Sequence, residues 1–346
     1  MCPEAALEPP RAFGPPVCPA RLRMQPEDFV VEEQLGFAPS GAGPHELLKV
    51  RKRNANTQWV ARELARACGC RPMDVGYAGL KDRRSVAVQW FSVPRAPRAH
   101  ADWAGVGGAQ FEVLEAHAHA RKLPRGALAG NRFLIRARGV TAGESSLGQR
   151  LASIRERGVP NYFGPQRFGR DGANLERIGQ DLRRLKPPER GFVLSAARSL
   201  IFNAVLGARV EDGSWARLGA GDLAILDGRG SHFPVEAPDE TLRERCASLE
   251  IHPTGPLWGR GAPPCGGSVL ALEERVAAQH GAACALLAEA GMDQERRSLR
   301  LSVRDLCWRR EGEDEVVLQF RLARGAYATA VLRELFTLAD YEQSNT

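Results

Sequence analysis

A single carboxylate lies among three cations in residues 76–91, GYAGLKDRRSVAVQWF. Asp82 follows Lys81 and precedes Arg83 and Arg84. Positive charge near a carboxylate favours its ionised form, and an ionised carboxylate can act as a nucleophile or as a general base. The neighbouring cations could then hold the phosphates of an anionic substrate. The alternative is a solvated hairpin turn in which these charges form local ion pairs.

The segments on either side of this cluster predict the elements that would position it. Residues 75–80 (VGYAGL) favour a short strand, and residues 85–93 (SVAVQWFSV) favour a second one because apolar residues recur at alternate positions. Neighbours along a strand point to opposite faces, so at most some of the three cations can face Asp82. We expect a strand–turn–strand connection, which can present a side chain from a rigid base.

A second cluster combines aromatic and basic side chains in residues 159–175, VPNYFGPQRFGRDGANL. Aromatic rings interleaved with arginines, here Phe163 and Phe168 around Arg167, suit stacking on unpaired bases and contact with phosphates. The alternative is an aromatic hinge that packs between two domains. Phe133, in the stretch GNRF, could also present its ring to a base or could belong to a core.

The composition is compatible with a folded, RNA-binding protein. The 346 residues suggest two or three domains, and the net charge of +7 is compatible with a nucleic-acid partner, although GC-rich coding also enriches arginine. The eight cysteines form no repeated CxxC pair, which argues against a zinc site. We find no secretory signal and no run of the ~20 apolar residues that span a bilayer. We therefore expect a cytoplasmic location, no membrane and no metal.

The order of predicted elements favours one α+β domain with an insertion. Residues 1–20 are rich in Pro and Ala, and we expect them to be irregular. Predicted strands dominate up to about residue 140 and return after residue 298. Between them we expect helices, including one at 174–185 (NLERIGQDLRRL), with residues 211–298 alternating between loops and helices. No P-loop, GxGxxG fingerprint or GxSxG elbow occurs in the chain.

Taken together, six segments resemble the TruD family of tRNA pseudouridine synthases. They occur in family order and cover nearly the whole chain: 26–33 (PEDFVVEE), 76–93 (GYAGLKDRRSVAVQWFSV), 121–133 (RKLPRGALAGNRF), 159–175 (VPNYFGPQRFGRDGANL), 194–206 (LSAARSLIFNAVL) and 326–335 (AYATAVLREL). Each segment alone is a weak signal, but the joint match is highly specific. Length and motif spacing look most like the bacterial branch, which modifies the uridine at position 13 of certain tRNAs.

The resemblance implies a fold and a partner. It implies a pseudouridine synthase catalytic domain with a mixed, mostly antiparallel sheet, formed by residues 21–156 and 299–346. A helix-rich TRUD domain, residues 157–298, would be inserted between these halves. The partner would be tRNA, the protein a monomer, and the reaction free of cofactor and metal, because isomerising uridine involves no redox change and no external group.

The resemblance also assigns site residues. Asp82 matches the aspartate of the family's AG-x-KD-[RKH] motif and would be catalytic. Arg23 matches a basic active-site position that is Lys in many members, so the charge is kept and the residue type is not. Phe133 and Asn131 match the GN-x-F motif, whose phenylalanine takes the place of a base-stacking tyrosine. With the cations Lys81, Arg83 and Arg167, they complete the predicted substrate-binding set.

Two other functions remain open from the residues. One is a non-catalytic tRNA-binding protein, such as a tRNA chaperone, on the same fold; the intact GLKDR segment argues against it. The other is a hydrolase or phosphoryl-transfer enzyme that uses Asp82 with a divalent ion. That chemistry needs further convergent carboxylates, and no motif in the chain supplies them.

Overall fold

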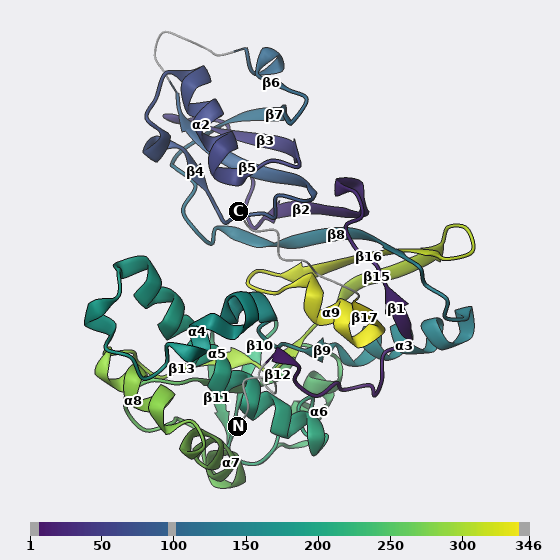
Figure 1. Cartoon of the computed structure of the whole chain (residues 1–346), viewed down its shortest axis with the longest axis vertical. Coiled ribbons are helices and arrows are strands. Elements are labelled where there is room, and N and C mark those ends of the chain that lie inside the picture. Colours follow the sequence, from purple (N-terminus) through teal and green to yellow (C-terminus); the bar gives the residue numbers. More distant parts are fainter. Residues whose placement is uncertain (1–6, 96–101, 339–346) are drawn as a thin grey trace.

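A nine-stranded sheet is the largest element in the computed structural model, which describes residues 7–95 and 102–338 (Figure 1). Its strands are β2 (Phe29–Leu35), β3 (His45–Arg53), β4 (Gly76–Tyr77), β5 (Val86–Pro94), β6 (Gly107–Gly108), β7 (Phe111–His119), β8 (Leu128–Arg138), β15 (Arg304–Arg310) and β16 (Glu315–Ala323). The order is β15-β16-β8-β2-β5-β3-β7-β6, with β4 also paired to β5. Among the described strands of this sheet, β2 and β5 form the one parallel pair, so the α+β class with a mixed, mostly antiparallel sheet is confirmed.

The sheet joins two parts of the chain that are far apart in sequence. β8 pairs with β16 along Gly130–Arg138 and Glu315–Ala323. Helices α3 (Glu144–Arg157) and α9 (Ala328–Leu335) pack their apolar side chains against these strands in one core. Helix α2 (Thr57–Cys68) packs in a second core beneath β3, β5 and β7. Asn56 caps α2 and Gly69 ends it in the left-handed conformation.

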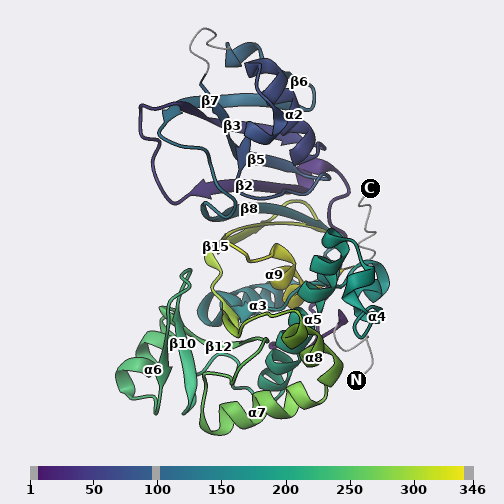
Figure 2. The same cartoon turned by 90° about the vertical axis from the view of Figure 1, so that its left-hand side faces the viewer.

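The middle of the chain forms a separate group of elements in the lower part of Figure 2. They are β9 (Val159–Pro160), α4 (Ala173–Glu176), α5 (Pro187–Glu211), β10 (Asp222–Leu226), β11 (His232–Val235), α6 (Glu240–Ala247), β12 (Ile251–Leu257), α7 (Gly267–Ala278), α8 (Gly281–Glu289), β13 (Glu295–Ser298) and β14 (Arg300–Leu301). β9 pairs with β14 where the chain leaves this group and returns to the large sheet.

Two expectations for this middle region are wrong. Residues 211–298 contain a four-stranded sheet in the order β11-β10-β12-β13, which we did not predict. β12 could not be recognised as a strand from the sequence, because it contains Pro253, Gly255 and Pro256, which are residue types that disfavour strands. The helix expected at 174–185 stops after α4, since Gly179 adopts a positive φ of 99° and a short 3-10 turn follows at Leu182–Arg184.

The N-terminal segment is not wholly irregular. Residues 1–6 lie outside the described part of the chain, but β1 (Cys18–Ala20) pairs in parallel with β17 (Phe336–Leu338). Cys18 and Ala20 are buried while Pro19 between them is exposed. This period-two burial docks the segment onto the end of the chain, so the expectation for residues 1–20 is wrong at its last three residues.

Helix α5 has the length and apolar composition of a membrane span, whereas we found no such run in the sequence. In the described ranges it is the single helix that passes this test, and 56% of its most apolar window is buried inside the protein. Val193, Ala197 and Ile201 of α5 pack against Leu286 and Leu287 of α8. We therefore interpret α5 as a core helix of the middle region.

Candidate active site

The Asp82 carboxylate lies at the surface and is held by one arginine. Arg23 Nη2 donates to Asp82 Oδ2 over 2.7 Å, although the two residues are 59 positions apart in sequence. The Arg23 side chain is only 13% exposed, whereas 53% of the Asp82 side chain remains exposed. The contact therefore positions the carboxylate and leaves it accessible to a substrate.

Two features fix the position of Arg23: a contact with an aromatic ring and an unusual backbone conformation. Its guanidinium carbon lies 3.9 Å from the centroid of the Phe29 ring, in β2. Its backbone has a φ of +57°, in the left-handed region that non-glycine residues seldom adopt. Such conformations persist where the surroundings determine the geometry, and they cluster at functional sites. Both features fix the approach of the guanidinium to Asp82.

A buried lysine supports the backbone of Asp82 from below. Lys52 Nζ donates to the carbonyl oxygens of Asp82 and Ala55, each over 2.8 Å. Ser85 Oγ donates to the same Asp82 carbonyl, also over 2.8 Å. Burial lowers the pKa of the Lys52 ammonium to about 8, and the charge of Asp82 opposes this shift. We did not predict a role for Lys52.

Two further buried side chains fix the loop between β4 and β5. Thr57 Oγ1 accepts from the Lys81 backbone N–H over 3.1 Å and donates to Gln89 Oε1 over 3.1 Å. Gln89 Nε2 donates to the Gly79 carbonyl over 2.6 Å. Satisfied polar networks of this kind make a backbone rigid. The loop is therefore anchored at Gly79 and Lys81, directly before Asp82.

The three cations next to Asp82 differ in their contacts and in their exposure to solvent. Lys81 Nζ donates to Glu33 Oε2 over 2.7 Å in a buried ion pair, so its ammonium is engaged below the surface. Burial raises the pKa of Glu33, and the Lys81 charge opposes that shift. Arg83 and Arg84 are exposed. Within residues 7–95 and 102–338 they form no ion pair with an acidic side chain. Arg83 and Arg84 are therefore the cations that an anionic ligand near Asp82 would meet.

One register row crosses the sheet beneath this loop. Lys52 pairs with Ala87, Ala87 with Val31, Val31 with Phe133 and Phe133 with Phe320. Strands are about 4.8 Å apart, so Phe133 lies two spacings, roughly 10 Å, from the strand that carries the Asp82 loop. The row brings Phe133 to the same face as Lys52.

Phe133 is covered rather than openly presented. Its side chain is 6% exposed and belongs to the core that α3 and α9 cover. Its ring centroid lies 6.0 Å from that of Phe29 and 5.4 Å from that of Phe320. Asn131 lies opposite Glu33 in the β2–β8 pair. In the described ranges Asn131 Oδ1 and Glu33 Oε1 are both buried and lack a hydrogen-bond donor.

Arg167 lies with the middle region and, in the described part of the chain, forms no hydrogen bond or ion pair with Asp82. Arg167 Nη1 donates to Ser195 Oγ and Nη2 donates to Tyr327 Oη, each over 2.9 Å. The rings around it, Phe163 and Phe168, are buried. In this structure the rings pack inside the protein, as the second of our two interpretations expects.

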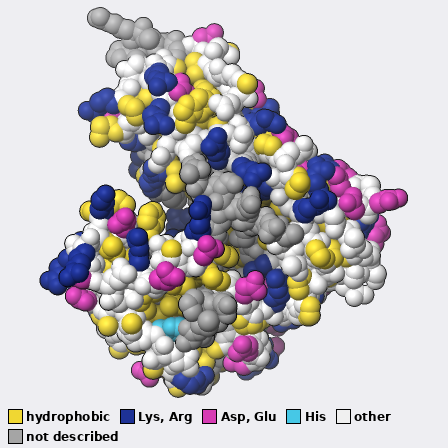
Figure 3. Space-filling model, in the orientation of Figure 1, with side chains coloured by type: hydrophobic (Ala, Val, Ile, Leu, Met, Phe, Trp, Pro, Cys, Tyr) yellow, Lys and Arg dark blue, Asp and Glu magenta, His cyan; other side chains and the backbone are white. Residues whose placement is uncertain are grey.

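Basic side chains surround a hollow in the surface. Figure 3 shows this hollow on the left, between the part that carries β3 and β5 and the part that carries α4 and α5, with Lys and Arg side chains on both sides. In the described ranges we find no group of three or more His, Cys, Asp or Glu side chains placed to hold a metal ion.

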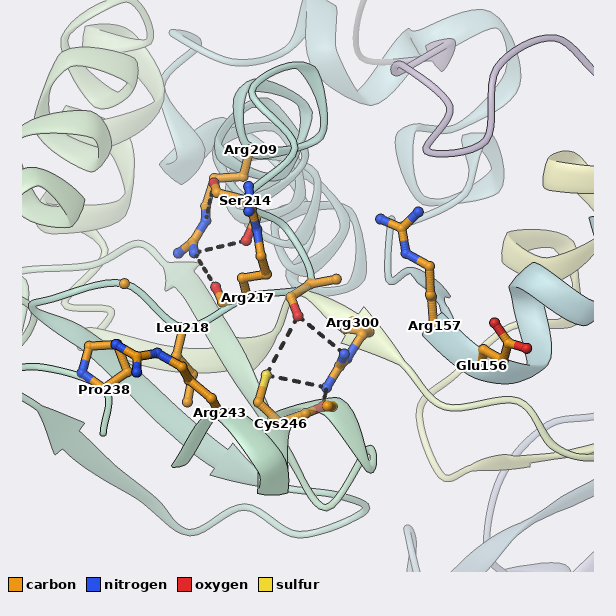
Figure 4. Close-up of a pocket in the computed structure, with 13 residues that line it drawn as sticks. Glu156, Arg157, Arg209, Ser214, Arg217, Leu218, Pro238, Arg243, Cys246 and Arg300 are labelled. Atoms are coloured by element: carbon orange, nitrogen blue, oxygen red, sulfur yellow. Dashed lines mark hydrogen bonds between the residues drawn. The ribbon is translucent and has the colours of Figure 1, made fainter. Parts of the chain in front are cut away.

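A cavity of about 720 Å³ lies elsewhere, where α3 meets the middle region (Figure 4). Its two buried arginines are already engaged: Arg209 with Asp222 over 2.6 Å, and Arg300 with backbone carbonyls such as that of Ile251. The predicted site residues are not among those that line it. We therefore place the candidate active site at Asp82.

Comparison with known proteins gives matches over nearly the whole chain. The family model described as tRNA pseudouridine synthase D (TruD) matches residues 14–190 and 180–335. The protein named tRNA pseudouridine synthase D from Methylococcus capsulatus is 47% identical over 94% of this chain and 93% of its own length. The protein of that name from Nitrosococcus oceani is 48% identical over 94% of this chain and 93% of its own length.

A solved structure shows the same fold. It comes from Methanosarcina mazei, and its description gives tRNA pseudouridine synthase D (TruD) as a provisional name. The TM-score is 0.76, with 20% sequence identity, and the match covers 96% of this chain and 97% of the other. At this identity the likeness establishes the shared fold alone.

Proposed function

The chain belongs to the TruD family of tRNA pseudouridine synthases, and from this premise we propose that it isomerises uridine to pseudouridine in tRNA, at position 13, with Asp82 as the catalytic residue. One observation carries the proposal. The Asp82 carboxylate is exposed and is held by Arg23 over 2.7 Å, on a backbone that Lys52 anchors. This geometry suits a carboxylate that must meet a sugar while staying ionised.

The reaction breaks the glycosidic bond from N1 of the uracil, rotates the base and rejoins it to the sugar through carbon 5. No electron is gained or lost and no outside group enters the product. An ionised Asp82 could attack carbon 1 of the ribose or remove the 2′ proton. Both routes need the charged form. The Arg23 guanidinium donates a charge-assisted hydrogen bond to this carboxylate and orients it.

The target base must leave its stack before Asp82 can reach the sugar, at a cost of a few kcal/mol. We propose that Phe133 stacks on the extruded uracil, which would return about 1–3 kcal/mol. Because only 6% of Phe133 is exposed, side chains that cover it must rearrange when the base enters. We propose that Asn131 contacts the base and that the exposed Arg83 contacts a phosphate.

The domain division is also a proposal. Residues 21–156 and 299–346 would form the catalytic domain, and residues 157–298 the inserted TRUD domain. Its support is the β9–β14 pair, which ties the start and the end of the middle region together beside the large sheet. We further propose that the chain works as a monomer in the cytoplasm, where its tRNA substrate is found.

The test compares the intact protein with an Asp82→Asn variant on an unmodified tRNA transcript. Pseudouridine is mapped by pseudouridine-specific chemical labelling, and tRNA affinity is measured in parallel. We expect product at position 13 from the wild type, none from Asp82→Asn, and a dissociation constant for tRNA that changes by no more than a few-fold. Asp74→Asn is the control, because Asp74 is a nearby carboxylate that pairs with Arg71.

Product from Asp82→Asn at a rate near that of the wild type would remove Asp82 from the mechanism. Tight tRNA binding by a wild-type protein that forms no pseudouridine would support the rival function, a non-catalytic tRNA-binding protein. Product at another uridine would correct the position while leaving the reaction in place.

A further inference from the structure

Two arginines of the middle region share one aromatic ring. The guanidinium carbon of Arg297, in β13, lies 4.3 Å from the centroid of Phe163, and that of Arg167 lies 5.2 Å from the same centroid. Arg297 also lies 5.6 Å from the Phe202 ring centroid. Two positive charges are therefore held close together on an apolar support.

Within the described residues, the hydrogen-bond partners of this pair are electrically neutral. Arg167 donates to the hydroxyls of Ser195 and Tyr327. Arg297 Nη2 donates to Asn161 Oδ1 over 2.7 Å, and Arg297 Nε is buried without an acceptor. In the described part of the chain neither arginine pairs with a carboxylate. The charges are therefore uncompensated.

Two other arginines of the same region, both with buried side chains, do have carboxylate partners. Arg209 pairs with Asp222 over 2.6 Å, and Arg296 pairs with Glu273 over 2.7 Å. A buried charge without a partner costs free energy. Burial lowers the pKa of Arg297 to about 10, and the charge of Arg167 acts in the same direction. This arrangement would be stabilised by an anion from outside the chain.

The pair is partly accessible to solvent and is connected, through Tyr327, to the chain that follows β16 of the large sheet. Arg167, Ser195 and Tyr327 are all partly exposed. Tyr327 belongs to the connection after β16, whose last residue, Ala323, pairs with Gly130. Gly130 precedes Asn131, which lies opposite Glu33, the partner of Lys81. These pairings connect the arginine pair with the strands that carry Asn131 and Glu33.

We propose that Arg167 and Arg297 together bind one phosphate group of the RNA backbone. The guanidinium fork matches phosphate oxygens, and the Ser195 and Tyr327 hydroxyls would supply additional donors. The site is distinct from Asp82 and positions the RNA without taking part in bond breaking. This inference rests on the proposed function because it takes tRNA as the anion.

The test is the salt dependence of tRNA binding by the intact chain. Each phosphate that a protein neutralises adds roughly 0.7–0.9 to the slope of log affinity against log salt concentration. We expect Arg297→Gln to reduce that slope by about this amount and Arg167→Gln to do the same. If both bind the same phosphate, the double variant will lose about as much as either single variant.

Matched variants separate charge from folding. Arg297→Lys keeps the charge, so its salt slope should match the wild type while its affinity falls. Arg309→Gln is the surface control, because Arg309 is an exposed arginine on β15 that already pairs with Glu311. Thermal melting is recorded for every variant, and Arg297→Gln should melt no lower than Arg309→Gln.

A salt slope in Arg297→Gln equal to that of Arg309→Gln would overturn the inference. So would a double variant whose loss of slope is twice that of each single variant, since that result means two separate phosphates. These outcomes are independent of the proposed function, which is judged by pseudouridine formation in the wild type. If the wild type makes pseudouridine but the variants keep the wild-type salt slope, the phosphate site is wrong and the proposed function stands.

Discussion

The Lys52 ammonium and the Asp82 carbonyl oxygen are 2.8 Å apart, which places a buried positive charge directly beneath the exposed carboxylate. The same ammonium reaches the Ala55 carbonyl, and its attraction to the Asp82 charge partly offsets the cost of its burial. Lys52 thus acts on Asp82 through the backbone rather than by touching a substrate. We regard it as a positioning residue.

We expect Lys52→Met to lower kcat by roughly 10–100-fold, because it removes a buried charged donor from the Asp82 and Ala55 carbonyls. Losing such a donor costs about 1–3 kcal/mol, and each 1.4 kcal/mol is a factor of ten in rate. The KM for tRNA should change by less than about three-fold. Lys49→Met is the matched control, since Lys49 lies on the same strand but pairs with Glu115 near the surface. Equal kcat losses in both variants would show that Lys52 has no special link to Asp82.

The depressed pKa of Lys52 gives a pH prediction with a definite sign. A lysine whose pKa falls from its ordinary value of 10.5 to about 8 on folding binds fewer protons in the folded state between those pH values. Stability then rises with pH across this window. Relative to Lys52→Met, the wild type should gain stability between pH 7.5 and 10, by up to about 3 kcal/mol. Denaturant unfolding at several pH values measures it, and a pH-independent difference would contradict the burial of a charged ammonium.

Arg23 should be replaceable by lysine at a moderate cost. Arg23→Lys keeps a positive charge near Asp82 but loses the planar contact with the Phe29 ring. We expect it to retain activity within about ten-fold of the wild type, whereas Arg23→Met should lose about 100-fold, or roughly 3 kcal/mol of transition-state stabilisation. Single-turnover rates at saturating enzyme measure both. Similar rates for the two variants would mean that charge at this position does not matter.

Phe133 has a packing role that must be separated from any stacking role. Phe133→Ala would open a cavity in the core and lower the stability of the protein by about 3–5 kcal/mol. A loss of activity in this variant could then come from either role. Phe133→Leu keeps most of the apolar volume and removes the ring, so it should cost less stability and still reduce the rate or the tRNA affinity. Phe320→Leu, at the neighbouring ring 5.4 Å away, controls for packing. Equal activity losses in the two leucine variants would argue against base stacking on Phe133.

The sequence pointed to some residues of this candidate site and missed others. Asp82 was singled out by the charges next to it, and Arg23 by the family resemblance. Lys52 also carried a signal, which we missed: it follows Leu48 and Val50 at alternate positions of a strand, so it shares their buried face. Arg297 carried no such signal in the sequence, because its partner Asn161 lies 136 residues away and only the fold brings the two together.

The buried pair of Lys81 and Glu33 offers a double-variant test of what holds the loop. Lys81→Met should destabilise the protein by about 3–5 kcal/mol at neutral pH, because it leaves the Glu33 carboxylate buried without its 2.7 Å partner. Burial already raises the pKa of Glu33, so that carboxyl should take up a proton more readily in Lys81→Met and the loss of stability should shrink as the pH falls. Lys81→Met combined with Glu33→Gln should recover most of the stability, as measured by urea unfolding. If the double variant is as unstable as Lys81→Met, the lysine stabilises the loop through its stem rather than through its charge, and the two residues do not act as a pair.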